Sequence, residues 1–151
     1  MSDISTEQRQ VIVFEIAGHL LAVDIMAVRE IRPWSPSTPL PGVPTFVRGV
    51  VNLRGVVLPV CDLGERLGWG RSTPTERHVI IVVSIDGQQV GLIADGVSDI
   101  LTFERSSVQP TGDIGADAVA FLEGLVLQDE RMLLLLALDR LGLAEALPEA
   151  A

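Results

Sequence analysis

The stretch VIVFEIAGHLLAVDIMAVREI, residues 11–31, decides the fold, because the chain repeats its pattern 69 residues later. Shifted by that distance, it lies without gaps on IIVVSIDGQQVGLIADGVSDI, residues 80–100, and six of the 21 positions are identical. Each copy holds two apolar runs that are rich in β-branched residues and are split by a glycine-containing turn, which is the pattern of a β-hairpin. The repeat indicates two similar structural units within one chain.

A second pair of similar segments follows in the same order. FVRGVV (46–51) lies on FLEGLV (121–126), and RGVVLPVCD (54–62) lies on RMLLLLALD (131–139) once two extra residues are placed in the second turn. Each pair is typical of two short strands joined by a turn. Short strands separated by turn signals outnumber helical patterns, so the sequence predicts a mainly β protein with two similar β-barrels packed into one domain.

The predicted boundaries follow changes in composition along the chain. The first residues are polar and aperiodic, a connector with Gly, Ser and Thr divides the two halves, and one helical pattern near the end begins with Asp139 as its N-cap. A loop is predicted over 100–117. The predicted parts are a mobile N-terminal tail (1–9), a single domain (10–145) with a first β subdomain at about 10–68 and a second at about 76–143, a connector (64–77), a short C-terminal helix (139–147) and a C-terminal tail (146–151).

Charge and composition exclude several classes of partner. The chain carries a net charge of −9, all 11 basic residues are arginine, and only 4% of the residues are aromatic. We therefore expect no nucleic acid partner, because such sites need basic grooves and stacking aromatic side chains. The longest apolar run, residues 132–138, is much shorter than the roughly 20 residues that cross a bilayer, so we expect no direct membrane insertion.

Positive charge is concentrated in one window of this acidic chain. Residues 31–61 contain Arg32, Arg48 and Arg54 but no acidic residue, so the window carries +3 while the whole chain carries −9. Two interpretations fit this distribution. The spacing is due to chance on a solvated face, or the window is a docking surface for an acidic partner.

Few residues suit catalysis or metal binding. Cys61 lies in an apolar strand, His19 lies at a turn, and His78 lies at the start of a strand, and these three are not spaced as zinc ligands. The repeat places Asp99 at the position of Glu30, which favours a structural role for this acid. The sequence therefore predicts no catalytic residue, no metal site and no cofactor. The alternative is a small hydrolase or metal enzyme that uses Cys61, His78 or Asp99.

Groups suited to protein recognition gather around the first of the two matching turns. Arg54 is a rigid, always-charged fork that can bind a carboxylate with two hydrogen bonds, and Gly55 and Asn52 favour a tight turn beside it. If Val28 and Phe46 are exposed, they form an apolar patch next to the arginines. The alternatives are a turn-stabilising salt bridge for Arg54 and core packing for Val28 and Phe46.

The motifs, taken in this order, resemble those of the CheW-type chemotaxis coupling proteins. The resemblance extends from about residue 11 to residue 143. It implies two SH3-like five-stranded β-barrel subdomains packed together, and a stand-alone adaptor without catalytic activity or cofactors. The matching segments are VREI (28–31), TPLPGVPTFVRGVVNLRGVVLPVCDL (38–63), LIADGVSDIL (92–101) and FLEGLVLQDERMLLLLALDRL (121–141).

The resemblance also implies the partners. CheW-like proteins couple the cytoplasmic tip of methyl-accepting chemoreceptors to the regulatory domain of the histidine kinase CheA, and they take part in ring assemblies with the kinase or with themselves. The implied location is the cytoplasm, with recruitment to membrane-associated receptor arrays. A coupling protein of a non-flagellar chemosensory pathway is an alternative that the motifs fit equally well.

Two groups of contact residues follow from the resemblance by position. The receptor contact is placed at the NLRG turn and the VREI segment, and the kinase contact is placed, more loosely, just before that turn. The predicted receptor-binding residues are Val28, Glu30, Asn52, Leu53, Arg54 and Gly55, and the predicted kinase-binding residues are Phe46, Val47, Arg48 and Gly49.

Overall fold

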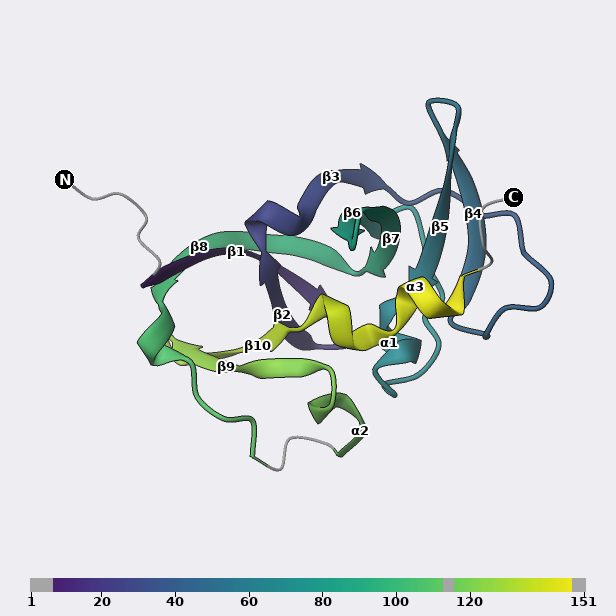
Figure 1. Cartoon of the computed structure of the whole chain (residues 1–151). Coiled ribbons are helices and arrows are strands. Elements are labelled where there is room, and N and C mark those ends of the chain that lie inside the picture. The colour runs from purple at the N-terminus through teal and green to yellow at the C-terminus, as the bar shows by residue number, and fades with distance from the viewer. Residues whose placement is uncertain (1–6, 113–115, 148–151) are drawn as a thin grey trace.

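The computed structural model describes residues 7–112 and 116–147, and these residues form a mainly β fold (Figure 1). The helical elements are short and connect or flank the strands. The strands are β1 (Gln8–Ile16), β2 (His19–Asp24), β3 (Val28–Pro33), β4 (Val47–Leu53), β5 (Val56–Asp62), β6 (Val79–Ile85), β7 (Gln88–Ala94), β8 (Gly96–Glu104), β9 (Leu122–Gln128) and β10 (Arg131–Leu136). The helical elements are η1 (Ile25–Ala27), α1 (Leu63–Arg66), η2 (Arg105–Ser107), α2 (Ala116–Val119), η3 (Leu138–Leu141) and α3 (Leu143–Ala146).

The strands form two five-stranded sheets, and this confirms the predicted fold class. Sheet A has the order β8-β1-β2-β10-β9, and sheet B has the order β3-β6-β7-β5-β4. Sheet B uses one continuous stretch, residues 28–94, whereas sheet A combines residues 8–24 with residues 96–136. The predicted subdomains at 10–68 and 76–143 therefore do not correspond to the sheets, because each half of the chain contributes strands to both.

The repeat explains this exchange of strands. In sheet A, Ile12 of β1 pairs with Ile100 of β8, and in sheet B, Ile81 of β6 pairs with Ile31 of β3. Ile12 and Ile81 are equivalent in the repeat, as are Ile31 and Ile100, so the first strand of each copy pairs with the third strand of the other copy. The segment 96–104, partly predicted as a loop, is for this reason the long edge strand β8.

The second matching turn has the same length as the first, so the predicted two-residue insertion is wrong. Arg54 and Gly55 form the turn between β4 and β5, and Asp129 and Glu130 form the turn between β9 and β10. All four residues have positive φ, between 51° and 83°, as a type I′ hairpin turn requires. Arg54 is thus equivalent to Asp129, and not to Arg131.

The hydrogen bonds after the two turns support the same alignment. The backbone N–H of Asp62 donates to the carbonyl of Phe46, and the N–H of Ala137 donates to the carbonyl of Phe121. Asp62 is therefore equivalent to Ala137, whereas the sequence comparison paired it with Asp139. The acid at the end of β5 is a feature of one half only.

Each sheet is nearly closed into a barrel by a single bridge between its edges. Thr38, which follows β3, pairs with Val50 of β4, and Gln109, which follows β8, pairs with Leu125 of β9. In both cases the segment that follows one edge strand crosses over to the other edge strand. The two bridges are equivalent in the repeat, so the two sheets close in the same way.

A glycine beside each bridge allows the chains to approach closely. Gly49 has a φ of 145°, and a Cβ added there would lie far inside contact distance of the Thr38 carbonyl oxygen. A Cβ added at Gly124 would lie 2.6 Å from the carbonyl oxygen of Gln109. The glycine of the repeated Phe-x-x-Gly motif is therefore a requirement of barrel closure.

Three apolar clusters hold the fold together. One cluster lies inside sheet A and includes Val13, and another lies inside sheet B and includes Val82. The largest cluster joins the two sheets and includes Phe14 of β1 and Ile81 of β6. Because β1 and β6 contribute side chains to two clusters each, they are apolar on both faces, which explains the continuous Val- and Ile-rich runs in the sequence.

Both predicted tails differ from the structure where they can be compared. β1 begins at Gln8, so the last two residues of the predicted mobile tail 1–9 belong to a strand, and residues 1–6 lie outside the described residues.

The predicted helix 139–147 is divided into η3 and α3 at Gly142, which has a φ of 66°. Asp139 is not its N-cap, because η3 begins after Ala137. Of the predicted tail 146–151, residues 148–151 lie outside the described residues.

Gly49→Ala tests the closure of sheet B. The new methyl group would overlap the Thr38 carbonyl, and overpacking of this kind typically costs about 1–3 kcal/mol. We expect a corresponding loss of unfolding free energy in urea denaturation. Gly96→Ala is the matched control, because no atom lies within 4 Å of the added Cβ there. Equal stability of both variants would contradict the closure role of Gly49.

Candidate functional site

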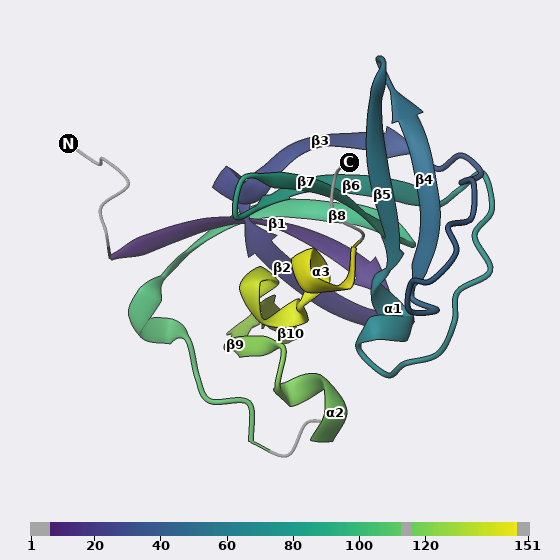
Figure 2. The same cartoon turned by 45° about the vertical axis from the view of Figure 1, so that its right-hand side comes forward.

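The turn between β4 and β5 lies at the end of a hairpin that projects from the rest of the molecule (Figures 1 and 2). Arg54 and Gly55 occupy its two central positions with φ values of 52° and 83°. The side-chain Oδ1 of Asn52 accepts a hydrogen bond of 2.8 Å from the backbone N–H of Gly55. Asn52 and Gly55 therefore shape the turn, and the turn presents the side chain of Arg54.

Arg54 forms an ion pair that connects the turn to β3. Its Nη2 donates a hydrogen bond of 2.6 Å to Oε1 of Glu30, and Arg32 approaches the same carboxylate at 3.7 Å. The Arg54 side chain is nevertheless 69% exposed. The salt bridge expected as an alternative role of Arg54 is thus present, yet most of the guanidinium surface stays accessible to a partner.

The ion pair changes the titration of both groups. The hydrogen bond from Arg54 is the main cause that lowers the pKa of Glu30, and the charges of Arg54 and Arg32 act in the same direction. The hydrogen bond to Glu30 likewise raises the pKa of Arg54. Because Arg54 is largely exposed and Glu30 is only partly buried, this pair fixes the orientation of the side chains more than it stabilises the fold.

Exposed valines flank the turn, and sequence reasoning did not identify them as part of the site. Val56 is 60% exposed and Val57 is 65% exposed. Two neighbouring residues of a strand point to opposite faces, so their joint exposure means that this end of the hairpin has no cover on either side. A run of apolar residues directly after a tight turn was the available signal, and it was interpreted as barrel core.

The other predicted receptor-binding residues are less accessible. Leu53 is only 5% exposed and packs in the cluster inside sheet B. Val28 is half-buried against the cluster between the sheets. The structure therefore brings Asn52, Arg54 and Glu30 together at the surface, whereas Leu53 and Val28 are packing residues of two different apolar clusters.

The four predicted kinase-binding residues lie directly before β4 (Phe46) and at its start (Val47, Arg48 and Gly49), and most of them are packed against or bonded to other groups. Val47 is 5% exposed and Gly49 is buried. Phe46 is half-buried, and the guanidinium of Arg66 lies 5.0 Å from its ring centroid. Arg48 is bound to the buried carboxylate of Asp62. A contact of Phe46 and Arg48 with a kinase stays a prediction, and Val47 and Gly49 offer little surface for it.

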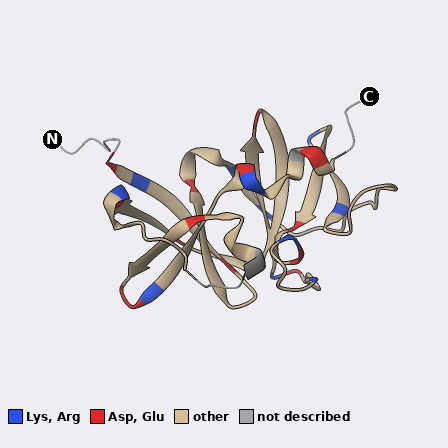
Figure 3. Cartoon of the chain, turned by 60° about the horizontal axis from the view of Figure 1, so that its bottom comes forward, with Lys and Arg blue, Asp and Glu red and all other residues tan. Residues whose placement is uncertain are grey.

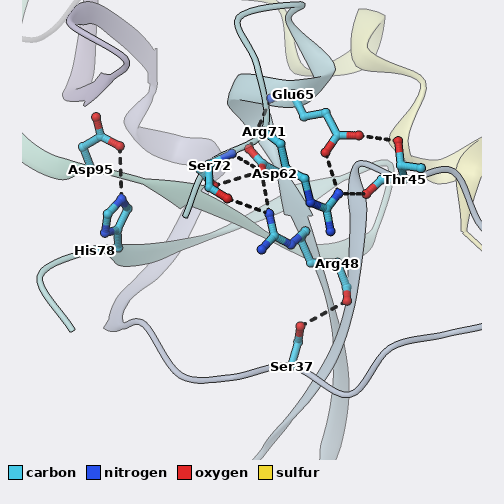
Figure 4. Close-up of polar contacts among 9 residues, drawn as sticks. All are labelled: Ser37, Thr45, Arg48, Asp62, Glu65, Arg71, Ser72, His78 and Asp95. Atoms are coloured by element: carbon cyan, nitrogen blue, oxygen red, sulfur yellow. Dashed lines mark hydrogen bonds and ion pairs between the residues drawn. The ribbon is translucent and has the colours of Figure 1, made fainter. Parts of the chain in front are cut away.

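Asp62 is the buried acid that organises this region (Figure 4). Its Oδ2 accepts hydrogen bonds from Nη1 of Arg48 at 2.8 Å, from the backbone N–H of Ser72 at 2.8 Å and from the hydroxyl of Ser72 at 2.9 Å. Nη1 of Arg48 also donates to the Ser72 carbonyl at 3.0 Å. The group fastens the connector between β5 and β6 to the start of β4.

Arg66 of α1 bridges the two halves and was not singled out from the sequence. Its guanidinium lies 5.0 Å from the ring centroid of Phe46 and 4.5 Å from that of Phe121. These phenylalanines are equivalent in the repeat. Its Nε also donates a hydrogen bond of 2.7 Å to the carbonyl of Leu141. One arginine therefore connects equivalent positions of both copies with the C-terminal segment.

The three residues of the alternative enzyme hypothesis do not form a reactive site. Cys61 has no exposed surface, and burial, followed by the charge of Asp62, raises the pKa of its thiol to about 12. His78 contacts Asp95 and Thr75, and Asp99 lies on the exposed strand β8. Within residues 7–112 and 116–147, no group of three His, Cys, Asp or Glu side chains is arranged to hold a metal ion.

No helix among the described residues is both long enough and apolar enough to cross a membrane.

The titration of Glu30 tests the ion pair at the turn. In Arg54→Gln, the carboxyl loses its main stabilising hydrogen bond, so we expect the pKa of Glu30 to rise towards its ordinary value. Arg32→Gln should cause a smaller rise, because Arg32 contributes less. Since the pKa is lowered in the folded state, the contribution of the pair is lost as the pH falls through it. NMR of the Glu30 side-chain carboxyl measures both shifts, and an unchanged titration in Arg54→Gln would contradict the pair.

Asp62→Asn tests the buried acid at the end of β5. The substitution removes the charge that Arg48 faces, and breaking a buried pair costs about 3–5 kcal/mol. We expect a loss near the lower end of that range, because Arg48 keeps 19% of its side chain exposed. Asp139→Asn is the control, since Asp139 is exposed and its loss should be nearly neutral. Chemical denaturation of both variants measures the difference.

Known proteins resemble this chain in both sequence and fold. The model of the CheW-like domain family matches residues 10–145. The chain is 48% identical to "Chemotaxis protein CheW" of Rhizobium meliloti (strain 1021), over 87% of this chain and 85% of that protein. It is 44% identical to "Probable chemotaxis protein CheW" of Rhizobium etli, over 93% of this chain and 92% of the relative.

A solved structure extends the likeness to three dimensions. The scaffolding protein TtCheW from Thermoanaerobacter tengcongensis superimposes with a TM-score of 0.82 at 32% sequence identity, covering 93% of this chain and 92% of that one. Fold, motif order and sequence identity over most of the chain agree. This chain therefore belongs to the CheW family of chemotaxis proteins.

Proposed function

We propose that this chain is a non-catalytic adaptor that couples the cytoplasmic tips of chemoreceptors to the histidine kinase CheA in bacterial chemotaxis. Membership of the CheW family supports the role in chemotaxis. The observation that carries the docking role is the projecting turn on which Arg54 is 69% exposed. On this proposal the protein acts in the cytoplasm, is recruited to membrane-associated receptor arrays and needs no cofactor.

The receptor contact in this proposal is centred on Arg54. A guanidinium that keeps most of its surface open can form further hydrogen bonds with a carboxylate of an acidic receptor tip. Glu30 holds the side chain in place from β3, and Asn52 holds the turn. The exposed Val56 and Val57 add apolar area beside the charge. Such a combination of an arginine with neighbouring apolar surface is typical of binding sites in which a few residues dominate affinity.

The kinase contact in this proposal lies at the start of β4. Phe46 and Arg48 are the two residues of the predicted group that keep partly accessible side chains. Val47 and Gly49 would act indirectly, because they set the path of β4 and so the positions of Phe46 and Arg48. The Asp62 group would then position Arg48 for the regulatory domain of the kinase.

Arg54→Glu tests the receptor contact in a reconstitution with receptor, CheA and this protein. The variant places like charges against the acidic partner, and losing a desolvated charged contact costs about 2–5 kcal/mol. We expect loss of receptor-coupled stimulation of kinase autophosphorylation, while circular dichroism shows an intact fold. Arg77→Glu makes the same charge change at another exposed arginine and should retain stimulation.

Full stimulation by Arg54→Glu would refute the placement of the receptor contact at this turn. Absence of stimulation by the unmodified protein, with receptor and kinase that respond to another CheW, would refute the coupling function for those partners.

A further inference from the structure

Arg66 differs from the ion-paired arginines in what its charge faces. Charged positions are spread over the elements of the chain (Figure 3), and arginines such as Arg48 and Arg54 bind carboxylates. In the part of the chain that the structure describes, Arg66 forms no ion pair. Its guanidinium instead lies 5.0 Å from the ring centroid of Phe46 and 4.5 Å from that of Phe121, within the range of a cation–π contact. Two aromatic rings and a backbone carbonyl therefore hold this cation.

The hydrogen bond of Arg66 joins two equivalent positions of the repeat. Arg66 and Leu141 are 75 residues apart, and the same spacing separates Phe46 from Phe121. By this spacing α1 (Leu63–Arg66) is equivalent to η3 (Leu138–Leu141). Because the two halves exchange strands reciprocally, they are related by a local two-fold axis. The bond of 2.7 Å from Nε of Arg66 to the Leu141 carbonyl therefore lies at that axis, where one side chain can reach both halves.

The neighbours of Arg66 hold the residue before Phe46. The hydroxyl of Thr45 donates a hydrogen bond to Glu65 of α1. Nη1 of Arg71 donates to the Thr45 carbonyl at 3.0 Å and to Oε1 of Glu65 at 2.8 Å. Thr45 and Phe46 lie before the first residue of β4. Their side chains are therefore set by contacts with Glu65 and Arg66 of α1.

We propose that Arg66 is the positioning residue of the kinase contact, because it holds the ring of Phe46 in the orientation that the regulatory domain of the kinase binds. This inference rests on the proposed placement of that contact at Phe46. Arg66 is itself anchored in the other half by Phe121 and by the Leu141 carbonyl, so the ring keeps its position relative to both sheets. A ring that is ordered before binding avoids the ordering cost of one side chain, which corresponds to up to roughly tenfold in affinity.

The proposed kinase and receptor contacts lie at opposite ends of the β4–β5 hairpin. α1 follows β5 at the base of the hairpin, whereas the turn with Arg54 forms its tip (Figure 2). The contacts of Arg66 are all at the base. Substitution of Arg66 should therefore leave the turn intact, and affinities for kinase and receptor report separately on the two ends.

The affinities of the full chain for CheA and for a chemoreceptor signalling fragment, measured by isothermal titration calorimetry, test the role of Arg66. Arg66→Met keeps a long side chain but removes the charge and the Nε–H donor. We expect its affinity for CheA to fall by roughly tenfold and its affinity for the receptor fragment to stay unchanged. Arg66→Lys keeps a cation beside the rings, so it should bind CheA more tightly than Arg66→Met does.

Arg140→Met is the matched control. Nη1 of Arg140 donates a hydrogen bond of 2.9 Å to the Leu122 carbonyl, so the substitution removes an arginine–carbonyl bond like that of Arg66. Among the described residues, Arg140 makes no contact of this kind with Phe46. Its affinity for CheA should equal that of the unmodified protein. Chemical denaturation of each variant shows whether the fold is intact.

A double-mutant cycle with Phe46→Ala distinguishes positioning from a general effect on the fold. If Arg66 acts through Phe46, Phe46→Ala lowers the affinity for CheA, and the addition of Arg66→Met lowers it no further. Additive losses would overturn the inference. So would an Arg66→Met variant that binds CheA like the unmodified protein, or one that loses receptor affinity to the same extent.

The outcomes separate this inference from the proposed function. A weakened Phe46→Ala variant together with an additive effect of Arg66→Met refutes the positioning role alone. An unchanged affinity of Phe46→Ala for CheA refutes the placement of the kinase contact, and the positioning role with it. Absence of binding between the unmodified protein and CheA refutes the coupling function itself.

Discussion

The fold depends on the pairing of strands from the two ends of the chain. β2 runs parallel to β10, with Leu21 beside Leu134, and β1 runs antiparallel to β8. Without these contacts, sheet A would fall into two separate hairpins and the single strand β8, and isolated hairpins are marginally stable in water. Pairing also completes the apolar cluster between the sheets, which draws residues from both. Sheet B is therefore formed by the middle segment of the chain, residues 28–94, and the segments on either side of it pair with each other in sheet A.

The repeat could be recognised from the sequence, but the exchange of strands could not. A pattern of apolar residues identifies segments that resemble each other, and Ile31 and Ile100 resemble each other whichever copy they pair with. The choice of partner depends on the short connections, such as η1, that carry the chain from one sheet to the other. The error in the second turn had another cause, since matching Arg54 with Arg131 by residue type outweighed the equal length of the two hairpins.

The candidate site was predictable in its backbone and less so in its side chains. The sequence located the Asn52–Gly55 turn correctly, because Gly55 favours positive φ and Asn52 is a residue type that bonds backbone groups at turns. The roles of Arg48 and Phe46 depend on Ser72 and Arg66, which lie in a segment that reads as a plain connector. The exposure of Val56 depends on how far the hairpin projects, which is a property of the whole fold.

The strand order of sheet A has a consequence for how the protein is made. On the ribosome, residues 28–94 emerge early enough to complete sheet B, while β1 and β2 still lack β8 and β10. Contacts between segments this distant in sequence form slowly. The side chains of β1 that pack inside sheet A, such as Val11 and Val13, therefore lack their partners from β8 and β10 and stay exposed until those strands are made. This exposure ends only after β10, the last strand of sheet A in the chain, has been made and has paired with β2.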